Sequence, residues 1–248
     1  MEQDFTEIQR EIIFGKRVIS EALKAGKYIE EVYFSKHFSD NIIQEIKAHN
    51  IPTRRVNEDT LTHTCGSRHH QGILAITSTF PFSNMEEVLV EALKFSYPIL
   101  LALDEIVDPH NLGAIIRSAE GAGVSGIIMS ERRTAPLTGA VVKASTGAVF
   151  HLKIVKVKNL LASLKVFKEK GFWIMGAHME SDREYFKADF KMPLVLVVGS
   201  EGKGLRENII KECDFLVKIP MLGKITSLNV SVATAIILFE ALKQRLYQ

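Results

Sequence analysis

The segment LVLVVGSEGKGL, residues 194–205, constrains the fold of this chain more than any other stretch. Its first five residues are all Leu or Val, a continuous apolar run that is typical of a strand buried on both faces of a parallel sheet. The glycines that follow let the backbone turn sharply and bring a ligand close to bare N–H groups. This pattern is typical of a ligand site at the carboxyl ends of parallel strands. From this segment alone, a plain strand-to-helix turn is the alternative.

The composition is that of an ordinary globular protein with one large or two modest domains: 248 residues, 46% hydrophobic and 24% charged. No apolar run reaches the roughly 18 residues of a membrane span, and the acidic N-terminus lacks the apolar core of a secretory signal. Cys65 and Cys213 stand far apart, so the sequence predicts neither a zinc site nor a disulfide framework. We therefore expect a cytoplasmic protein without a metal, which fits a reducing compartment.

The charge is unevenly distributed along the chain. The formal net charge is only +2, but residues 1–96 carry −3 and residues 97–248 carry +5. If an acidic polymer binds, the second part supplies most of the attraction. Solvated helix faces are the alternative explanation of the same charges.

Helical and strand patterns alternate through the first 79 residues, which predicts a small α/β domain. Residues 11–35 are expected to form a helix and then a strand. The expected helices span 17–25, 40–49 and 57–64, and the expected strands 29–34, 51–56 and 73–77. A linker is expected over residues 80–96, where a Pro-containing stretch precedes an acidic helix.

Residues 97–248 show a longer βαβ series, which predicts a mainly parallel sheet with helices on both faces. The expected strands span 99–103, 127–129, 149–154, 172–176, 194–198 and 215–219. The expected helices span 109–121, 137–145, 159–170 and 205–211, with a final helix from Val230.

The glycine segment matches neither common phosphate-binding motif. GSEGKG is not G-x-G-x-x-G, and Lys203 is followed by Gly204 where a P-loop has Ser or Thr. Glu201 in the turn would also repel a phosphate. A ligand with positive charge suits this turn better.

Two further stretches carry polar residues beside helix starts. Asp108 and Pro109 are a typical helix start, and the helix that follows carries Asn111 and, off its buried face, Arg117. An exposed ion pair between Arg117 and Glu120 is the alternative to a functional role. In the second stretch, Ser227 and Asn229 precede an apolar helix, where they act either as ordinary N-caps or as site residues.

Three segments in order, DPHNLGAIIRSAEGAGVSGII, LVLVVGSEGKGL and IPMLGKITSLNVSVA, resemble the three motifs of the SpoU/TrmH-type RNA ribose 2′-O-methyltransferases of the SPOUT superfamily. The resemblance is closest to the branch that methylates a guanosine ribose in 23S ribosomal RNA. Upstream, FGKRVISEAL and RHHQGILA resemble the N-terminal substrate-binding domain of that branch, which has an L30e-like fold. With the expected linker at residues 80–96, the N-terminal substrate-binding domain would span residues 1–79 and the methyltransferase domain residues 97–248.

The resemblance also implies a cofactor, a site and an assembly. S-adenosylmethionine would bind in a C-terminal trefoil knot, and the chain would form a homodimer, for which we expect the last helix to supply the contact. The cofactor-binding residues would be Gly199, Gly202, Ile219, Met221 and Leu228. The catalytic site would contain Arg117 held by Asn111, together with Glu201, Ser227 and Asn229. Arg117 would act either as the base or as a grip on the adjoining phosphate, and its high pKa favours the second role.

Two rival functions remain from the sequence: ribose methylation of transfer RNA, and a non-catalytic RNA-binding factor in ribosome assembly. The intact Arg117, Glu201 and Asn229 argue against the second. As RNA contacts, Arg132 and Arg133 are better candidates than Arg54, Arg55 and Arg68. His69 and His70 are interpreted as structural or RNA-facing residues.

Overall fold

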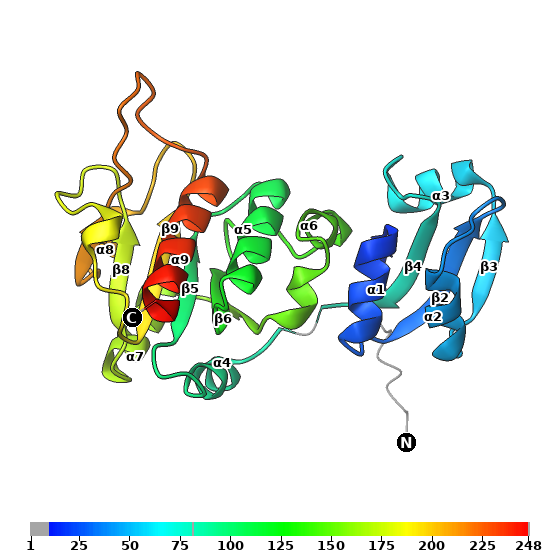
Figure 1. Cartoon of the computed structure of the whole chain (residues 1–248), viewed down its shortest axis with the longest axis horizontal. Coiled ribbons are helices and arrows are strands. Elements are labelled where there is room, and N and C mark those ends of the chain that lie inside the picture. The colour runs from blue at the N-terminus through cyan, green and yellow to red at the C-terminus, as the bar shows by residue number, and fades with distance from the viewer. Residues whose placement is uncertain (1–9, 81, 248) are drawn as a thin grey trace. The chain divides into compact units, whose positions relative to one another are not determined.

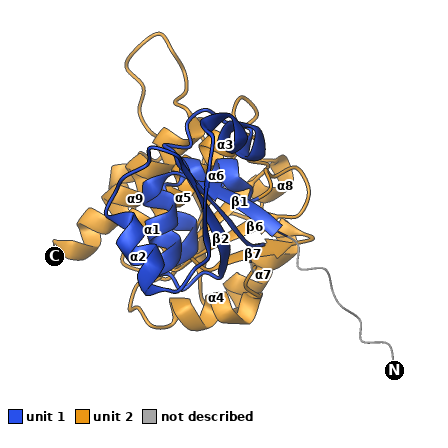
Figure 2. Cartoon of the chain, turned by 90° about the vertical axis from the view of Figure 1, so that its right-hand side faces the viewer, with its two compact units in different colours: residues 1–81, 137–151 blue, residues 82–136, 152–248 orange. Residues whose placement is uncertain are grey.

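The computed structural model describes residues 10–80 and 82–247. By their packing these residues form two units, one of residues 10–80 and 137–151 and the other of residues 82–136 and 152–247, which Figure 2 colours separately. Within these described ranges, no helix combines the length and the apolar character that crossing a membrane requires.

The first unit is built on a four-stranded mixed sheet. β1 (Arg10–Phe14), β4 (Ile73–Ser78) and β2 (Ile29–Ser35) are antiparallel neighbours, and β3 (Thr53–Val56) extends the sheet parallel to β2. The helices of this unit are α1 (Lys16–Lys24), α2 (Ile42–Ala48), α3 (Glu58–Cys65) and α6 (Gly139–Ala144), with a 3₁₀ turn, η1, over Ala148–His151. The small α/β domain expected for the N-terminal part is confirmed.

Two local predictions of secondary structure are wrong. No strand is expected at Arg10–Phe14, yet these residues form β1, because their backbone groups pair with β4 some sixty positions later in the chain. The strand expected over 149–154 begins only at Ile154. Before it, Gly147 turns the chain with a φ of +87° and Phe150 N donates to Gly147 O at 3.0 Å, which makes a 3₁₀ turn of apolar residues.

The second unit contains a six-stranded sheet in which every neighbouring pair is parallel. Its order is β10 (Phe215–Val217), β8 (Trp173–Ala177), β9 (Leu194–Gly199), β5 (Ile99–Asp104), β6 (Gly126–Ser130) and β7 (Ile154–Val157). All residues of β5 and β9 are buried, as their continuous apolar runs predict. The parallel sheet expected from the sequence is confirmed.

Helices cover both faces of this sheet, as Figure 1 shows. On one face, α4 (Met85–Ala92), α7 (Leu160–Glu169) and α8 (Glu207–Ile210) pack into one core with alternate strand residues. On the other face, α5 (Pro109–Gly121) lies against α9 (Val230–Leu246). A short 3₁₀ turn, η2 (Tyr185–Lys187), precedes β9.

The packing units do not follow the expected domain limits throughout. Residues 80–96 are expected to be a linker, whereas Val88 and Ala92 of α4 are fully buried in the core of the second unit. Residues 137–151 are expected in the second domain, whereas they pack with the first unit. The functional domain limits 1–79 and 97–248 stay a prediction.

Candidate functional site

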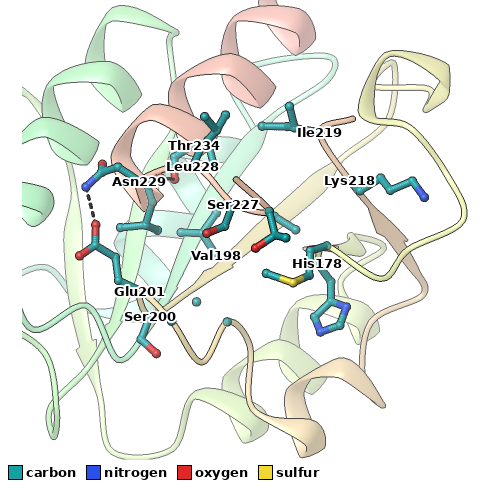
Figure 3. A pocket seen from close by; sticks show the side chains of 18 of the residues that line it. His178, Val198, Ser200, Glu201, Lys218, Ile219, Ser227, Leu228, Asn229 and Thr234 are labelled. Carbon is teal, nitrogen blue, oxygen red and sulfur yellow. Dashed lines mark hydrogen bonds between the residues drawn. The ribbon is translucent and has the colours of Figure 1, made fainter. Parts of the chain in front are cut away.

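A cavity of about 730 Å³ lies at the carboxyl ends of three neighbouring strands, β9, β8 and β10. Its walls come from the ends of these strands, from the loops that follow them and from the first two turns of α9 (Figure 3). The carboxyl edge of a parallel sheet is the usual position of a ligand site, and this volume suits a small organic molecule.

The turn that follows β9, residues 200–204, forms one wall of this cavity. Its ends are closed by two backbone hydrogen bonds, from Ser200 N to Gly204 O at 3.1 Å and from Gly204 N to Ser200 O at 2.9 Å. Gly202 and Gly204 have φ values of +82° and +65°, which favour glycine. A Cβ on Gly199 would lie 2.5 Å from Leu205 N and closer still to the carbonyl group of Gly204. Together, these glycines make so tight a turn possible; we call residues 199–204 the glycine turn.

A polar network connects the glycine turn to two helices. The side-chain amide of Asn229 donates to Asn111 Oδ1 at 2.9 Å and to the carboxylate of Glu201. Figure 3 shows the side chains of Glu201 and Asn229 pointing toward one another. Because both amide hydrogens of Asn229 are used, the orientation of this side chain is fixed.

Helix starts position both asparagines of this network. Asn229 caps α9, its Oδ1 accepting from Ser231 N at 2.9 Å. Asn111 lies in the first turn of α5, where Asp108 caps the helix by accepting from His110 N at 2.7 Å. Asn111 is buried. The expected capping role of Asn229 and its expected place in the site are therefore combined in one residue.

The structure places most of the sequence-derived site residues together. The residues expected to bind the cofactor all line the cavity: Gly199, Gly202, Ile219, Met221 and Leu228. Of the residues expected to be catalytic, Glu201, Ser227 and Asn229 line it as well, and Asn111 is attached to it through Asn229. Their chemical roles stay predictions.

Arg117 is the exception among these residues. It is exposed on α5, six positions or about 9 Å along the helix axis from Asn111, and it is not among the residues that line the cavity. None of the ion pairs found among the described residues involves Arg117, so the alternative pair with Glu120 does not form.

Sequence reasoning missed a second wall of the cavity. His178, Met179 and Glu180, directly after β8, line it, as does Lys218 directly after β10. The sequence predicts both β8 and β10, and a ligand site is usual at the carboxyl ends of such strands. The positions directly after these two strands are therefore the signal that could have identified these residues. The cavity wall thus carries carboxylates at Glu180 and Glu201 as well as cationic groups.

Several basic residues of the first unit have structural partners. The guanidinium of Arg55 donates to the carbonyl oxygens of Ser35, Lys36 and Phe38, and Arg54 lies 3.2 Å from Glu31. These contacts favour a structural role for Arg55.

His70 also has a structural role. It is buried, its Nε2 lies 3.0 Å from Thr62 Oγ1, and its Nδ1 accepts from Gly72 N at 3.0 Å. Both ring nitrogens are therefore occupied, which agrees with the structural interpretation. Among the described residues, no group of three or more His, Cys, Asp and Glu side chains is arranged to hold a metal ion.

Comparison with known families gives two matches that together cover most of the chain. Residues 98–239 match the SpoU rRNA Methylase family, and residues 12–83 match the family described as RNA 2′-O ribose methyltransferase substrate binding. YacO of Bacillus subtilis, assigned to the TrmH family of tRNA/rRNA methyltransferases, is 35% identical over 96% of this chain and 97% of its own length.

Solved structures of methyltransferases are also similar to this chain. The SpoU methyltransferase AviRb from Streptomyces viridochromogenes, in complex with the cofactor AdoMet, has a TM-score of 0.83 at 25% identity and covers 96% of this chain and 92% of its own. An AdoMet-bound rRNA methyltransferase from Sinorhizobium meliloti has a TM-score of 0.80 at 27% identity and covers 98% and 89%.

Proposed function

Because the chain belongs to the SpoU rRNA Methylase family, we propose that it methylates a ribose 2′-hydroxyl in RNA, specifically of a guanosine in 23S ribosomal RNA. At the level of the family, the chain is an S-adenosylmethionine-dependent RNA methyltransferase. The observation that best supports methyl transfer at this site is the cavity at the ends of β8, β9 and β10, which is lined by the site residues expected from the second and third motifs.

The residues of this cavity fit S-adenosylmethionine. Its volume of about 730 Å³ lies in the range of small-molecule sites. Val198, Ile219 and Leu228 offer apolar walls for a flat heterocycle, and the glycine turn offers backbone groups at close range. The carboxylate of Glu201 suits a positively charged ligand. When bound, this cofactor supplies a methyl group attached to a positively charged sulfur atom.

The side chains of the network have a positioning role. A ribose hydroxyl is a weak nucleophile until its proton is removed, so its alignment with the methyl group decides much of the rate. Well-aligned reactants can gain roughly 7–11 kcal/mol over free ones. Asn229, held by Asn111 and Glu201, gives the cavity one fixed polar edge against which a ribose can be oriented.

We assign Arg117 to the RNA phosphate next to the target ribose. Its guanidinium has a pKa above ~12 in proteins generally, so it acts as a fixed cation and not as a base. A bidentate contact with phosphate would hold the nucleotide, and the positive charge would favour the ionised hydroxyl. Asn111 lies on the same helix and is tied to the cavity, which fixes α5 relative to the site.

We further propose a homodimer that forms through α9. Val232, Phe239 and Leu246 are 46%, 48% and 64% exposed, and they recur every seven residues, which places them in one stripe along the helix. A stripe of this kind is typical of a helix that packs against a second copy. We also propose that the C-terminal part of the chain forms a trefoil knot and that the protein is cytoplasmic.

Methylation mapping tests this function. Mass spectrometry would locate 2′-O-methylated riboses in 23S ribosomal RNA and in transfer RNA from cells with and without the protein, and purified protein would then be given unmodified RNA. A guanosine of 23S ribosomal RNA that loses its methyl group in cells and regains it in vitro supports the proposal. A site in transfer RNA supports the first rival, and unchanged methylation with retained RNA binding supports the assembly factor.

A further inference from the structure

Four charged side chains form a continuous series of ion pairs at the carboxyl edge of the second sheet: Asp104, Arg206, Glu105 and Arg133. Asp104 is the last residue of β5, lies opposite Gly199 of β9 in register, and has a completely buried carboxylate. Neither its neighbours in sequence nor any motif position marks it for a role in the site.

Arg206 satisfies both oxygens of this buried carboxylate. Its Nε and Nη2 lie 2.8 and 2.6 Å from Asp104 Oδ1, and its own backbone N–H donates to Asp104 Oδ2 at 3.1 Å. A carboxylate without access to water requires such compensation. The hydrogen bond and the charge of Asp104 also raise the pKa of Arg206.

The ion pair between Asp104 and Arg206 lies close to both ends of the glycine turn. Arg206 is only two residues beyond Gly204, and Asp104 lies beside Gly199, so the pair holds both ends of the turn. Between those ends lies Glu201, whose carboxylate accepts from Asn229. Glu201 thus lies between two points that the ion pair contacts, although neither Asp104 nor Arg206 lines the cavity.

A second contact joins the pair to another loop. Glu105 Oε1 accepts from Arg133 Nη1 at 2.9 Å and lies 3.7 Å from Arg206 Nε. Glu105 and Arg133 have φ values of +62° and +57°, a region that non-glycine residues seldom adopt. Because local strain of this kind persists only where its surroundings hold it, these contacts fix the loops after β5 and β6 as well.

We propose that Asp104 and Arg206 are positioning residues for methyl transfer, which hold the glycine turn so that Glu201 meets Asn229 and the cofactor meets a preformed wall. This inference rests on the proposed function for its catalytic part. Its structural part is that the ion pair keeps the glycine turn ordered, and this part does not depend on which RNA is the substrate.

The test compares Arg206→Lys with Lys211→Gln in the full-length protein. Lysine keeps the charge of Arg206 but cannot reach Asp104 with two nitrogens. Lys211, five residues further on, makes an exposed pair with Glu207 and serves as the control. The measurements are the affinity for S-adenosylhomocysteine by calorimetry, hydrogen exchange of the amides of residues 199–205, and the rate of methyl transfer.

We expect Arg206→Lys to remain folded by circular dichroism and to exchange the amides of residues 199–205 faster than wild type. We also expect it to bind S-adenosylhomocysteine more weakly and to transfer methyl groups about 10²-fold more slowly, as expected for misplaced reacting groups. Lys211→Gln should match wild type in all three. If the wild-type protein does not methylate the RNA offered, the proposed function fails, and the exchange and affinity data still decide this inference.

One double variant keeps the test decisive if the single variants misfold. Asp104→Asn combined with Arg206→Gln replaces the ion pair by two neutral amides that can bond to one another. We expect this double variant to be more stable than either single variant and to recover part of the affinity lost by them. Wild-type affinity and wild-type exchange of residues 199–205 in a folded Arg206→Lys variant would overturn the inference.

Discussion

The side-chain amide of Asn229 donates to Asn111 Oδ1 at 2.9 Å across 118 positions of the chain, and the same amide donates to Glu201. One asparagine therefore connects the first turn of α5, the glycine turn and the start of α9. Because its oxygen is occupied as the cap of α9, the amide has only one orientation that satisfies every partner. The network is thus specific for an amide at position 229.

Asn229→Asp should separate catalysis from helix capping. An aspartate still caps α9, but it cannot donate, and its charge repels Glu201. Losing a hydrogen bond to a charged group costs about 1.5–3 kcal/mol, so we expect methyl transfer to fall by about 10- to 100-fold with α9 intact. Steady-state kinetics and circular dichroism measure the two effects.

Asn159→Asp is the matched control for this change. Asn159 caps α7 in the same way, accepting from Ala162 N at 3.2 Å, and is not among the cavity residues. We expect wild-type rates in that variant. Equal rates in both variants would remove the Asn229 network from the mechanism.

Arg117→Ala should abolish methyl transfer and leave cofactor binding unchanged. Arg117 does not line the cavity, so S-adenosylhomocysteine should bind with wild-type affinity in calorimetry. Loss of a charge-assisted phosphate contact removes alignment of the ribose, which is worth about 10²-fold or more in rate. Glu120→Ala, exposed on the same helix, is the control for changes in α5 itself. Turnover near wild type in Arg117→Ala would contradict the assigned role.

Gly199→Ala should destroy the cavity wall. The added Cβ would lie 2.5 Å from Leu205 N, so the backbone of the glycine turn must move, at a cost of roughly 1–3 kcal/mol for overpacking. We expect a lower melting temperature and no measurable cofactor binding. Gly121→Ala is the comparison, because its Cβ would meet only Phe239 at 3.8 Å. A Gly199→Ala protein with wild-type affinity would show that the tight turn is dispensable.

The sequence predicts most of the second sheet because its signals are local. The apolar run at residues 194–198 is typical of a strand buried on both faces, and the glycines directly after it predict a tight turn. The start of α5 at Asp108 and of α9 at Asn229 are likewise read from adjacent residues. The expected site residues of the second and third motifs accordingly line one cavity, whereas Arg117 of the first motif does not.

What the sequence does not predict depends on pairs far apart in the chain. β1 forms because it finds β4 as a neighbour, and Asp104 is buried because Arg206 follows 102 positions later. Taken alone, the five residues of β1 are too short a run to be told from the start of a helix, and Asp104 looks like an ordinary polar residue after a strand. His178 and Lys218 were missed for a related reason, since only the order of the strands brings their loops together.

The two cysteines should differ strongly in reactivity. Burial raises the pKa of the Cys213 thiol to about 12, from a usual value near 8.5–9, so its thiolate at pH 8 is scarcer by about 10³-fold. We expect iodoacetamide at pH 8 to modify Cys65 and to leave Cys213 unmodified, as intact-mass spectrometry can measure. A Cys65→Ser variant should react only after denaturant is added, and rapid labelling of that folded variant would contradict the raised pKa of the Cys213 thiol, which is partly buried.

Phe239→Glu should convert a dimer into a monomer. Phe239 is the middle residue of the stripe formed with Val232 and Leu246, and it is about half exposed. A charge placed there would be buried without a partner in the dimer, which typically costs about 3–5 kcal/mol, or roughly 10²- to 4 × 10³-fold in affinity. Sedimentation at micromolar concentration should give a dimer for wild type and a monomer for the variant. Val90→Glu, an exposed apolar residue of α4, should remain dimeric, and a monomeric wild type would remove α9 as an interface.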